Sequence, residues 1–153
     1  MSERIGAAAA GQGGSGSEPS GGEGPQDAVG SSGVRVLVVE DDASVRDHAV
    51  RLVRNLGYTV REAADGHEAL RLLIEDPRCD ILFSDVVMPG MSGGQLAQAA
   101  KLMLPRLAVV FVTGHHADPL VEQLRREGAA AVLPKPYRRQ AVASALQRAL
   151  ERR

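Results

Sequence analysis

Short apolar runs alternate with segments of helical spacing from residue 34 onward, and this alternation constrains the fold more than any other feature. A short apolar run indicates a buried strand, whereas apolar residues at intervals of three and four indicate a helix. Five such pairs in succession predict an α/β domain, a doubly wound, five-stranded parallel sheet flanked by five helices. The predicted strands span residues 34–39, 58–63, 80–84, 107–112 and 130–133, and the predicted helices span residues 43–56, 66–75, 92–103, 119–127 and 137–151.

The first 33 residues differ in composition from the rest of the chain. They are rich in Gly, Ser and Ala and contain few large apolar side chains. Such a segment cannot bury enough apolar surface to offset the entropy of ordering it. We therefore expect residues 1–33 to form a disordered tail and residues 34–153 to form the folded domain. The core must be largely aliphatic, because aromatic residues make up only 3% of the chain.

Composition narrows the classes of function. A net charge of −1 gives no basis for binding nucleic acid by bulk charge, and we expect no direct contact with DNA. The single cysteine, Cys79, excludes an intramolecular disulfide and a cysteine zinc cluster. The sequence has no apolar stretch of membrane-spanning length and no signal-peptide pattern. We therefore expect a cytoplasmic protein that does not contact a membrane.

Polar side chains stand where four of the predicted strands end. The acidic triplet 40–42 follows the first strand, Asp85 follows the third, Thr113 follows the fourth and Lys135 lies just beyond the fifth. Open α/β sheets bind their ligands outside the carboxyl ends of the strands, so we expect these side chains to lie close together. Clustered carboxylates repel one another unless a cation neutralises them. Mg²⁺ prefers oxygen ligands and often binds phosphate oxygens as well, so the pattern predicts a site for Mg²⁺ and a phosphoryl group.

Each of these residues also has an ordinary structural interpretation. Acidic residues favour helix N-termini, which would account for the triplet 40–42. A threonine at a strand end often makes a turn hydrogen bond, and a lysine is most often a surface charge. Lys135 is less ordinary, because it lies between two prolines that keep the backbone extended. No single ordinary interpretation accounts for acids, a hydroxyl and a lysine at the ends of four different strands.

The sequence resembles the receiver domain of two-component response regulators over nearly all of its folded part. The residues that carry the resemblance are the segments 37–42, 80–93, 111–114 and 135–136, in this order and spacing. The resemblance implies a flavodoxin-like fold in which the five strands, numbered in chain order, are arranged 2-1-3-4-5.

The resemblance also implies a role for each candidate residue. Asp85 would accept the phosphoryl group. Mg²⁺ would be held by Glu40, Asp41, Asp85 and the backbone carbonyl of Val87. Thr113 and Lys135 would bind the phosphoryl oxygens. Phosphoryl transfer depends mainly on positioning and charge neutralisation, which this set of residues would supply.

The partners follow from the same resemblance. A sensor histidine kinase or a histidine phosphotransfer domain would donate the phosphoryl group from a phosphohistidine, and a downstream output protein would recognise the phosphorylated state. The domain would catalyse only its own phosphorylation and dephosphorylation, so it would not be a conventional enzyme. It would be either a single-domain regulator or the receiver of a hybrid kinase.

The chain departs from the receiver pattern in the fifth predicted strand. Many receivers carry an aromatic residue three positions before the lysine, where the ring swings inward with the threonine. This chain has Val132 at that position. An aromatic rotamer switch at that position is therefore not available. Tyr137, two residues after Lys135, is expected to pack with the last helix.

Two other classes of protein are alternatives to a receiver domain, and the first of them also uses a strand-end aspartate. A Mg²⁺-dependent phosphohydrolase of the haloacid-dehalogenase type has an aspartate nucleophile, but usually has a second aspartate two residues later, where this chain has Val87. A nucleotide-binding module would need a glycine-rich phosphate loop after the first strand, and none follows it. Stable modification of Asp85 by acetyl phosphate with Mg²⁺ would favour the receiver, whereas rapid turnover of a substrate would favour the hydrolase.

Overall fold

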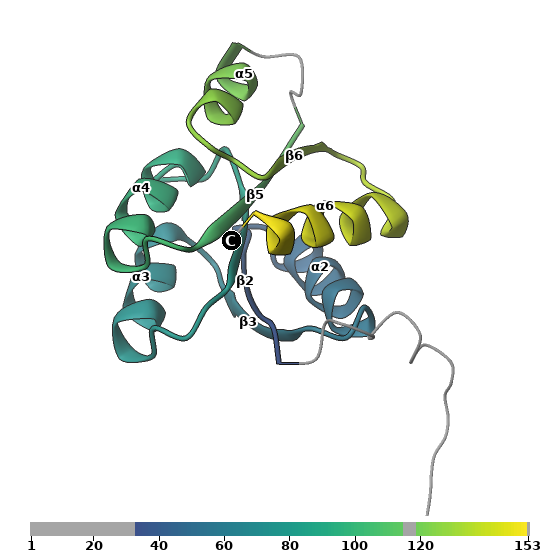
Figure 1. Cartoon of the computed structure of the whole chain (residues 1–153), viewed down its shortest axis with the longest axis horizontal. Helices are drawn as coiled ribbons and strands as arrows, with labels where there is room; N and C mark the ends of the chain where they lie inside the picture. Colours follow the sequence, from purple (N-terminus) through teal and green to yellow (C-terminus); the bar gives the residue numbers. More distant parts are fainter. Residues whose placement is uncertain (1–32, 115–118, 153) are drawn as a thin grey trace, which may run out of the picture.

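The computed structural model describes residues 33–114 and 119–152. Within these residues, five strands and five helices alternate along the chain (Figure 1). The strands are β2 (Arg35–Val39), β3 (Thr59–Ala63), β4 (Ile81–Asp85), β5 (Ala108–Thr113) and β6 (Ala131–Pro134). The helices are α2 (Ala43–Asn55), α3 (Gly66–Glu75), α4 (Gly93–Met103), α5 (Pro119–Arg126) and α6 (Arg139–Glu151). Every predicted element of residues 34–151 is present, and the predicted tail lies outside the described residues except for Gly33.

The five strands form one sheet in the order β3-β2-β4-β5-β6, and all four pairings are parallel. This order confirms the predicted 2-1-3-4-5 arrangement. The chain runs outward from β2 to β3 and then crosses back to β4 on the other side of β2. The strand order therefore reverses between β2 and β4, and the crevice at such a reversal is where doubly wound sheets bind ligands.

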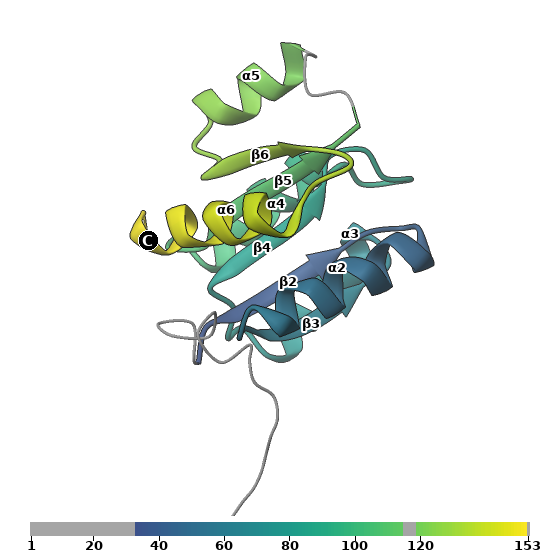
Figure 2. The ribbon, with the colours of Figure 1, turned by 90° about the vertical axis from the view of Figure 1, so that its right-hand side faces the viewer.

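Helices cover both faces of the sheet, as the alternating pattern predicted. Helices α2 and α6 lie against one face, and α3, α4 and α5 lie against the other (Figures 1 and 2). Among the described residues, no helix combines the length and the apolar character needed to cross a membrane.

Alternate residues of each strand point to opposite faces, so the sheet divides the core into two clusters. In β2, Val36 and Val38 pack towards α2 and α6, whereas Leu37 and Val39 pack towards α3 and α4. All four side chains are buried. Burying one such side chain contributes about 1.5–3 kcal/mol to folding. The core is therefore largely aliphatic, as the composition predicted.

Local sequence signals fix most helix ends. Ser92 caps α4 and forms a reciprocal capping box with Gln95, in which each side chain accepts from the other residue's backbone N–H. Gly57 adopts a left-handed φ of 101° directly after Leu56, the C-cap residue of α2, and a residue with a side chain would be strained there. The last helix begins at Arg139, two residues later than predicted. Arg138 has an extended backbone and is the N-cap residue, so Tyr137 precedes the helix, with its ring packed edge-on against Phe83 of β4 at a centroid distance of 6.1 Å.

Candidate functional site

Three carboxylates converge where β2 and β4 end. Glu40 and Asp41 directly follow β2, and Asp85 is the last residue of β4. Each offers one oxygen atom, and these three atoms lie within 4.8 Å of one another. Glu40 and Asp85 are buried, whereas Asp41 is exposed and opens the cluster to solvent. This arrangement could hold a metal ion.

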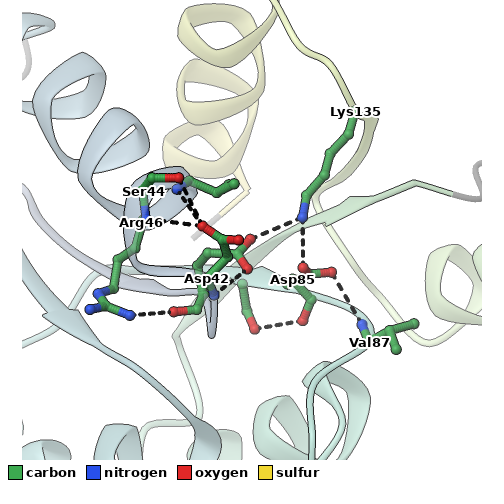
Figure 3. Close-up of polar contacts among 9 residues, drawn as sticks. Asp42, Ser44, Arg46, Asp85, Val87 and Lys135 are labelled. Atoms are coloured by element: carbon green, nitrogen blue, oxygen red, sulfur yellow. Dashed lines mark hydrogen bonds and ion pairs between the residues drawn. The ribbon is translucent and has the colours of Figure 1, made fainter.

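Lys135 neutralises part of this cluster. Its Nζ donates to Asp85 Oδ2 at 2.7 Å and to Glu40 Oε1 at 2.9 Å (Figure 3). Burial, the largest influence on Lys135, disfavours its charged form, but the hydrogen bonds to Asp85 and Glu40 outweigh burial and raise its pKa. The ammonium is therefore held in its charged form between two carboxylates. The Lys135–Pro136 peptide bond is cis.

Glu40 has an unfavourable environment for its negative charge. Burial raises the pKa of Glu40, and the neighbouring charge of Asp85 adds to the effect. The backbone N–H of Asp42 donates to Glu40 Oε2 at 3.0 Å and, with Lys135, opposes the shift only in part. Three carboxylates face one ammonium, so the cluster keeps an excess of negative charge. A divalent cation with oxygen ligands fits both the charge and the donor atoms.

Asp42 does not belong to the acidic cluster. Its side chain caps α2 by accepting from the backbone N–H groups of Ser44 and Val45, at 2.9 and 3.0 Å. These hydrogen bonds lower the pKa of Asp42. The acidic triplet 40–42 therefore has two roles. Asp42 caps the helix, as acids at helix N-termini often do, and Glu40 and Asp41 belong to the cluster with Asp85.

Thr113 and Val87 lie at the edge of the cluster. Thr113 is the buried last residue of β5, one position beyond Val112, which pairs with Asp85 in the sheet. The Thr113 backbone carbonyl accepts from the Lys135 N–H at 2.8 Å, which ties the two strand ends together. The backbone N–H of Val87 donates to Asp85 Oδ1 at 3.2 Å. The role of the Val87 carbonyl as a metal ligand stays a prediction.

Sequence reasoning missed one residue that holds the acidic loop in place. Arg46 of α2 donates from Nη1 to the Glu40 backbone carbonyl at 2.8 Å (Figure 3). Its Nε lies 3.2 Å from Glu62 Oε1 on β3. The arginine therefore links the loop to the neighbouring strand. Arg46 lies in the first turn of α2, where a cation interacts unfavourably with the helix dipole. This unusual position was the signal in the sequence that Arg46 has a specific partner.

A glycine lets the chain turn closely past Asp85. Gly93 begins α4, and its N–H donates to the Val86 carbonyl at 2.8 Å. A Cβ at position 93 would overlap the Asp85 backbone oxygen and touch the Val86 Cα. That oxygen also accepts from the buried hydroxyl of Ser84 at 2.9 Å. The backbone of Asp85 is thus fixed from two sides.

Comparisons of the sequence with known proteins agree with this geometry. Residues 36–147 match the model of the response regulator receiver domain family. The chain is 37% identical over 123 residues to the sensor kinase CckA of Brucella abortus, a match that covers 80% of this chain and 13% of CckA. It is 36% identical over 103 residues to the response regulator receiver protein CpdR of the same organism, covering 67% of this chain and 85% of CpdR. The chain therefore spans a small part of the first relative and most of the second.

Solved structures show the same fold. A response regulator receiver domain protein of Clostridium thermocellum superposes with a TM-score of 0.73 at 28% identity, covering 78% of this chain and 95% of that protein. The chemotaxis protein CheY4 of Vibrio cholerae superposes with a TM-score of 0.69 at 31% identity, covering 76% of this chain and 98% of CheY4. The alternative of a haloacid-dehalogenase phosphohydrolase receives no support from these matches. The chain belongs to the response regulator receiver domain family of two-component signalling systems.

Proposed function

We propose that this receiver domain accepts a phosphoryl group on Asp85, with Mg²⁺ bound beside it. The observation that carries the proposal is the placement of the Asp85 carboxylate. One of its oxygens lies 2.7 Å from the Lys135 ammonium, and it shares a site with the carboxylates of Glu40 and Asp41. A nucleophilic carboxylate in phosphoryl transfer needs nearby positive charge to offset the charge of the incoming group, and this site offers it.

The metal would be held by Glu40, Asp41 and Asp85, with the Val87 backbone carbonyl as a further ligand. Mg²⁺ takes oxygen ligands, keeps several waters and binds phosphate oxygens, so the exposed side of the cluster at Asp41 suits it. When bound, the ion would supply charge neutralisation at the phosphoryl oxygens. The excess negative charge of three carboxylates against one ammonium supports a divalent rather than a monovalent cation.

The chain's own residues would carry the transfer. A carboxylate oxygen of Asp85 forms a bond to phosphorus while the phosphorus–nitrogen bond of a phosphohistidine breaks, and the imidazole nitrogen leaves with the electron pair. Lys135 would stay within reach of the transferred group, because it already donates to Asp85. Thr113, at the end of the next strand, would donate its hydroxyl to a phosphoryl oxygen. Attack by water would later release phosphate and regenerate the Asp85 carboxylate.

The partners proposed are those of a signalling domain. A sensor histidine kinase or a histidine phosphotransfer domain would supply the phosphohistidine, and a downstream output protein would read the product. The domain would modify only itself, and we propose that it acts in the cytoplasm without contacting DNA or a membrane. The match to part of CckA supports a hybrid-kinase origin, and the match to most of CpdR supports a single-domain regulator.

Intact-mass spectrometry after incubation with acetyl phosphate tests the proposal. The full chain should gain the mass of one phosphoryl group when Mg²⁺ is present and none when EDTA replaces it. The variant Asp85→Asn should gain none in either condition. The control Asp80→Asn changes an acid at the opposite end of β4, next to Ile81, and should behave as the parent chain does. Modification that persists in Asp85→Asn, or that proceeds equally without Mg²⁺, would contradict the proposal.

A further inference from the structure

A groove of about 220 Å³ lies between α4 and α5, on the sheet face opposite α2 and α6. Its apolar lining includes Ala97 of α4, Val109 and Phe111 of β5, and Leu124 of α5. On the α4 side, the small residues Gly94 and Ala97 line the groove. It therefore has room for an apolar side chain.

Two further hollows extend this groove around the end of the sheet. One, of about 330 Å³, shares Lys101 with the groove, and the other, of about 380 Å³, shares Ala129 with it. The two hollows share Ala130 and Arg152 with each other. We call the groove and the two hollows the basal channel. It surrounds the residues that precede β5 and β6, whereas Asp85 ends β4 at the opposite edge of the sheet.

The wall of the basal channel is strongly cationic. Five basic residues line the two hollows: Lys101, Arg106, Arg125, Arg148 and Arg152. Lys101 comes from α4, Arg106 from the loop before β5 and Arg125 from α5, whereas Arg148 and Arg152 come from α6 and its C-terminal end, so the fold gathers them from four separate places.

Little negative charge within the described residues offsets these cations. Arg125 lies 3.9 Å from Glu122, but both side chains are more than half exposed, so the pair is weak. Arg152 donates from Nη1 to the neutral Ala129 carbonyl at 2.9 Å and lines both hollows. Glu127 is the one acid that lines the channel among these residues, and its Oε2 accepts from Gln123.

We propose that the basal channel binds an acidic segment of a partner protein, with one apolar side chain of that segment seated between α4 and α5. The cations supply charge complementarity for carboxylates, and the apolar groove supplies an anchor position next to them. A nucleic acid would satisfy the cations but has no apolar side chain for the groove, and the net charge of −1 gives it no long-range attraction. This surface is separate from the phosphoryl site, so the inference does not depend on the chemistry at Asp85.

A fluorescence anisotropy titration of the full chain tests the inference. The probe is a short fluorescein-labelled peptide with one leucine flanked by glutamates, and its matched control replaces every glutamate by glutamine. We expect saturable binding of the glutamate peptide that weakens with added salt, and much weaker binding of the glutamine peptide. The double variant Lys101→Glu with Arg148→Glu should weaken binding of the glutamate peptide by about tenfold or more.

Two further variants separate the channel from general charge effects. Arg54→Glu makes the same kind of charge change on α2, on the other face of the sheet, and should leave binding unchanged. Ala97→Leu fills the apolar groove without altering charge and should also weaken binding. Thermal melting of each variant checks that it is folded, and the charge variants change only side chains outside the core.

Several outcomes would overturn the inference. Equal binding of the two peptides, or no saturable binding up to about 1 mM peptide, would show that the channel does not recognise acidic segments. Tighter binding of a DNA duplex that the double variant abolishes would make the surface a nucleic-acid site. Self-association of the free chain that the double variant abolishes would make it a contact between copies of this chain.

Discussion

Lys135 Nζ lies 2.7 Å from Asp85 Oδ2, although the two residues are 50 positions apart in the sequence. The same ammonium lies 2.9 Å from Glu40 Oε1, so one cation serves two buried carboxylates from different strand ends. A buried carboxylate that loses its cation keeps an uncompensated charge, which is destabilising. The stability of the domain should therefore depend on Lys135 even before any phosphoryl group is present.

We predict that Lys135→Met destabilises the domain by about 2 kcal/mol at neutral pH without divalent cations, a value below the full cost of a buried pair because the lysine is partly exposed. Addition of Mg²⁺ should recover part of the loss, because in the proposed site the ion would neutralise the same carboxylates. Urea unfolding with EDTA and with Mg²⁺ measures both effects. Arg51→Met is the matched control: it breaks an exposed pair with Asp47 and should cost less than about 1 kcal/mol.

The stability conferred by Glu40 should fall as pH rises. Burial raises its pKa above the ordinary value of 4.5, so the folded state binds the Glu40 proton more tightly than the unfolded state does. Stability from this residue is present below the ordinary pKa and is lost as pH rises through the raised value. Glu40→Gln, which has no charge to bury, should therefore gain stability relative to the parent chain between about pH 4.5 and pH 7 in EDTA.

Melting temperatures of the two proteins across this pH range measure the effect. Other carboxylates titrate in both proteins, so their contributions cancel in the difference. Mg²⁺ should reduce the difference at neutral pH by stabilising the ionised carboxylate of the parent. A difference in melting temperature between the two proteins that stays constant with pH would contradict the raised pKa of Glu40.

The helices and strands could be predicted from the sequence because their signals are local. Apolar spacing located each element, and residues such as Ser92 and Gly57 marked ends through capping and left-handed backbone. The strand order was not available from the periodicity and came from the resemblance to receivers. The sheet confirms it as β3-β2-β4-β5-β6.

The candidate site was predictable only in part. Strand-end placement brought Glu40, Asp41 and Asp85 together, because parallel strands end at one edge of the sheet. The contact between Lys135 and Glu40, and the support that Arg46 gives the Glu40 carbonyl, depend on side-chain reach across elements that the sequence does not encode locally. The requirement for Gly93 likewise arises from a backbone that passes close by in three dimensions.

Two adjacent glycines should respond oppositely to alanine. Gly93→Ala would drive a Cβ into the Asp85 backbone oxygen, so the loop must shift, with an expected cost of about 1–3 kcal/mol. Gly94→Ala meets only ordinary contact with Leu124 and should gain about 0.5–1 kcal/mol from helix propensity. Urea unfolding gives the stabilities, and acetyl phosphate labelling should fall only in Gly93→Ala. Equal stabilities of the two variants would contradict the close approach of position 93 to the Asp85 backbone oxygen.

Asp41 should matter for the metal and not for the fold. Its carboxylate is exposed, so Asp41→Asn should leave the melting temperature in EDTA nearly unchanged. Replacing the Asp41 carboxylate by a neutral amide removes one negative charge and one carboxylate oxygen from the cluster. This change should abolish Mg²⁺-dependent labelling by acetyl phosphate. Asp47→Asn, an exposed acid on α2 outside the cluster, is the control and should label normally. Unchanged labelling of Asp41→Asn across a range of Mg²⁺ concentrations would remove Asp41 from the site.

Activation should travel from Asp85 through β5 to β6 without an inward-swinging ring. Val132 is buried where many receivers have an aromatic residue, and it pairs across the sheet with Phe111 of β5. Phe111 and Thr113 are two positions apart, so their side chains share one face of β5, and both are buried. A shift of Thr113 towards a phosphoryl group would therefore act on the Phe111–Val132 pair through packing and backbone.

We predict that beryllofluoride, a mimic of the phosphoryl group, changes amide chemical shifts from Asp85 through Thr113 and Gly114 to residues 130–137. The receiver resemblance implies that the output protein recognises the surface formed by α5, β6 and α6. A bound group shifts the equilibrium between two states only by binding them unequally, so the extent of these changes reports how strongly the site is coupled to that surface. Asp85→Asn should show none of the changes, which separates specific binding from salt effects. Phe111→Leu keeps an apolar core but removes the ring, and should shrink the changes at residues 130–137 while leaving those next to Asp85. Changes confined to residues 85–90 in the parent chain would mean that the surface read by the partner lies elsewhere.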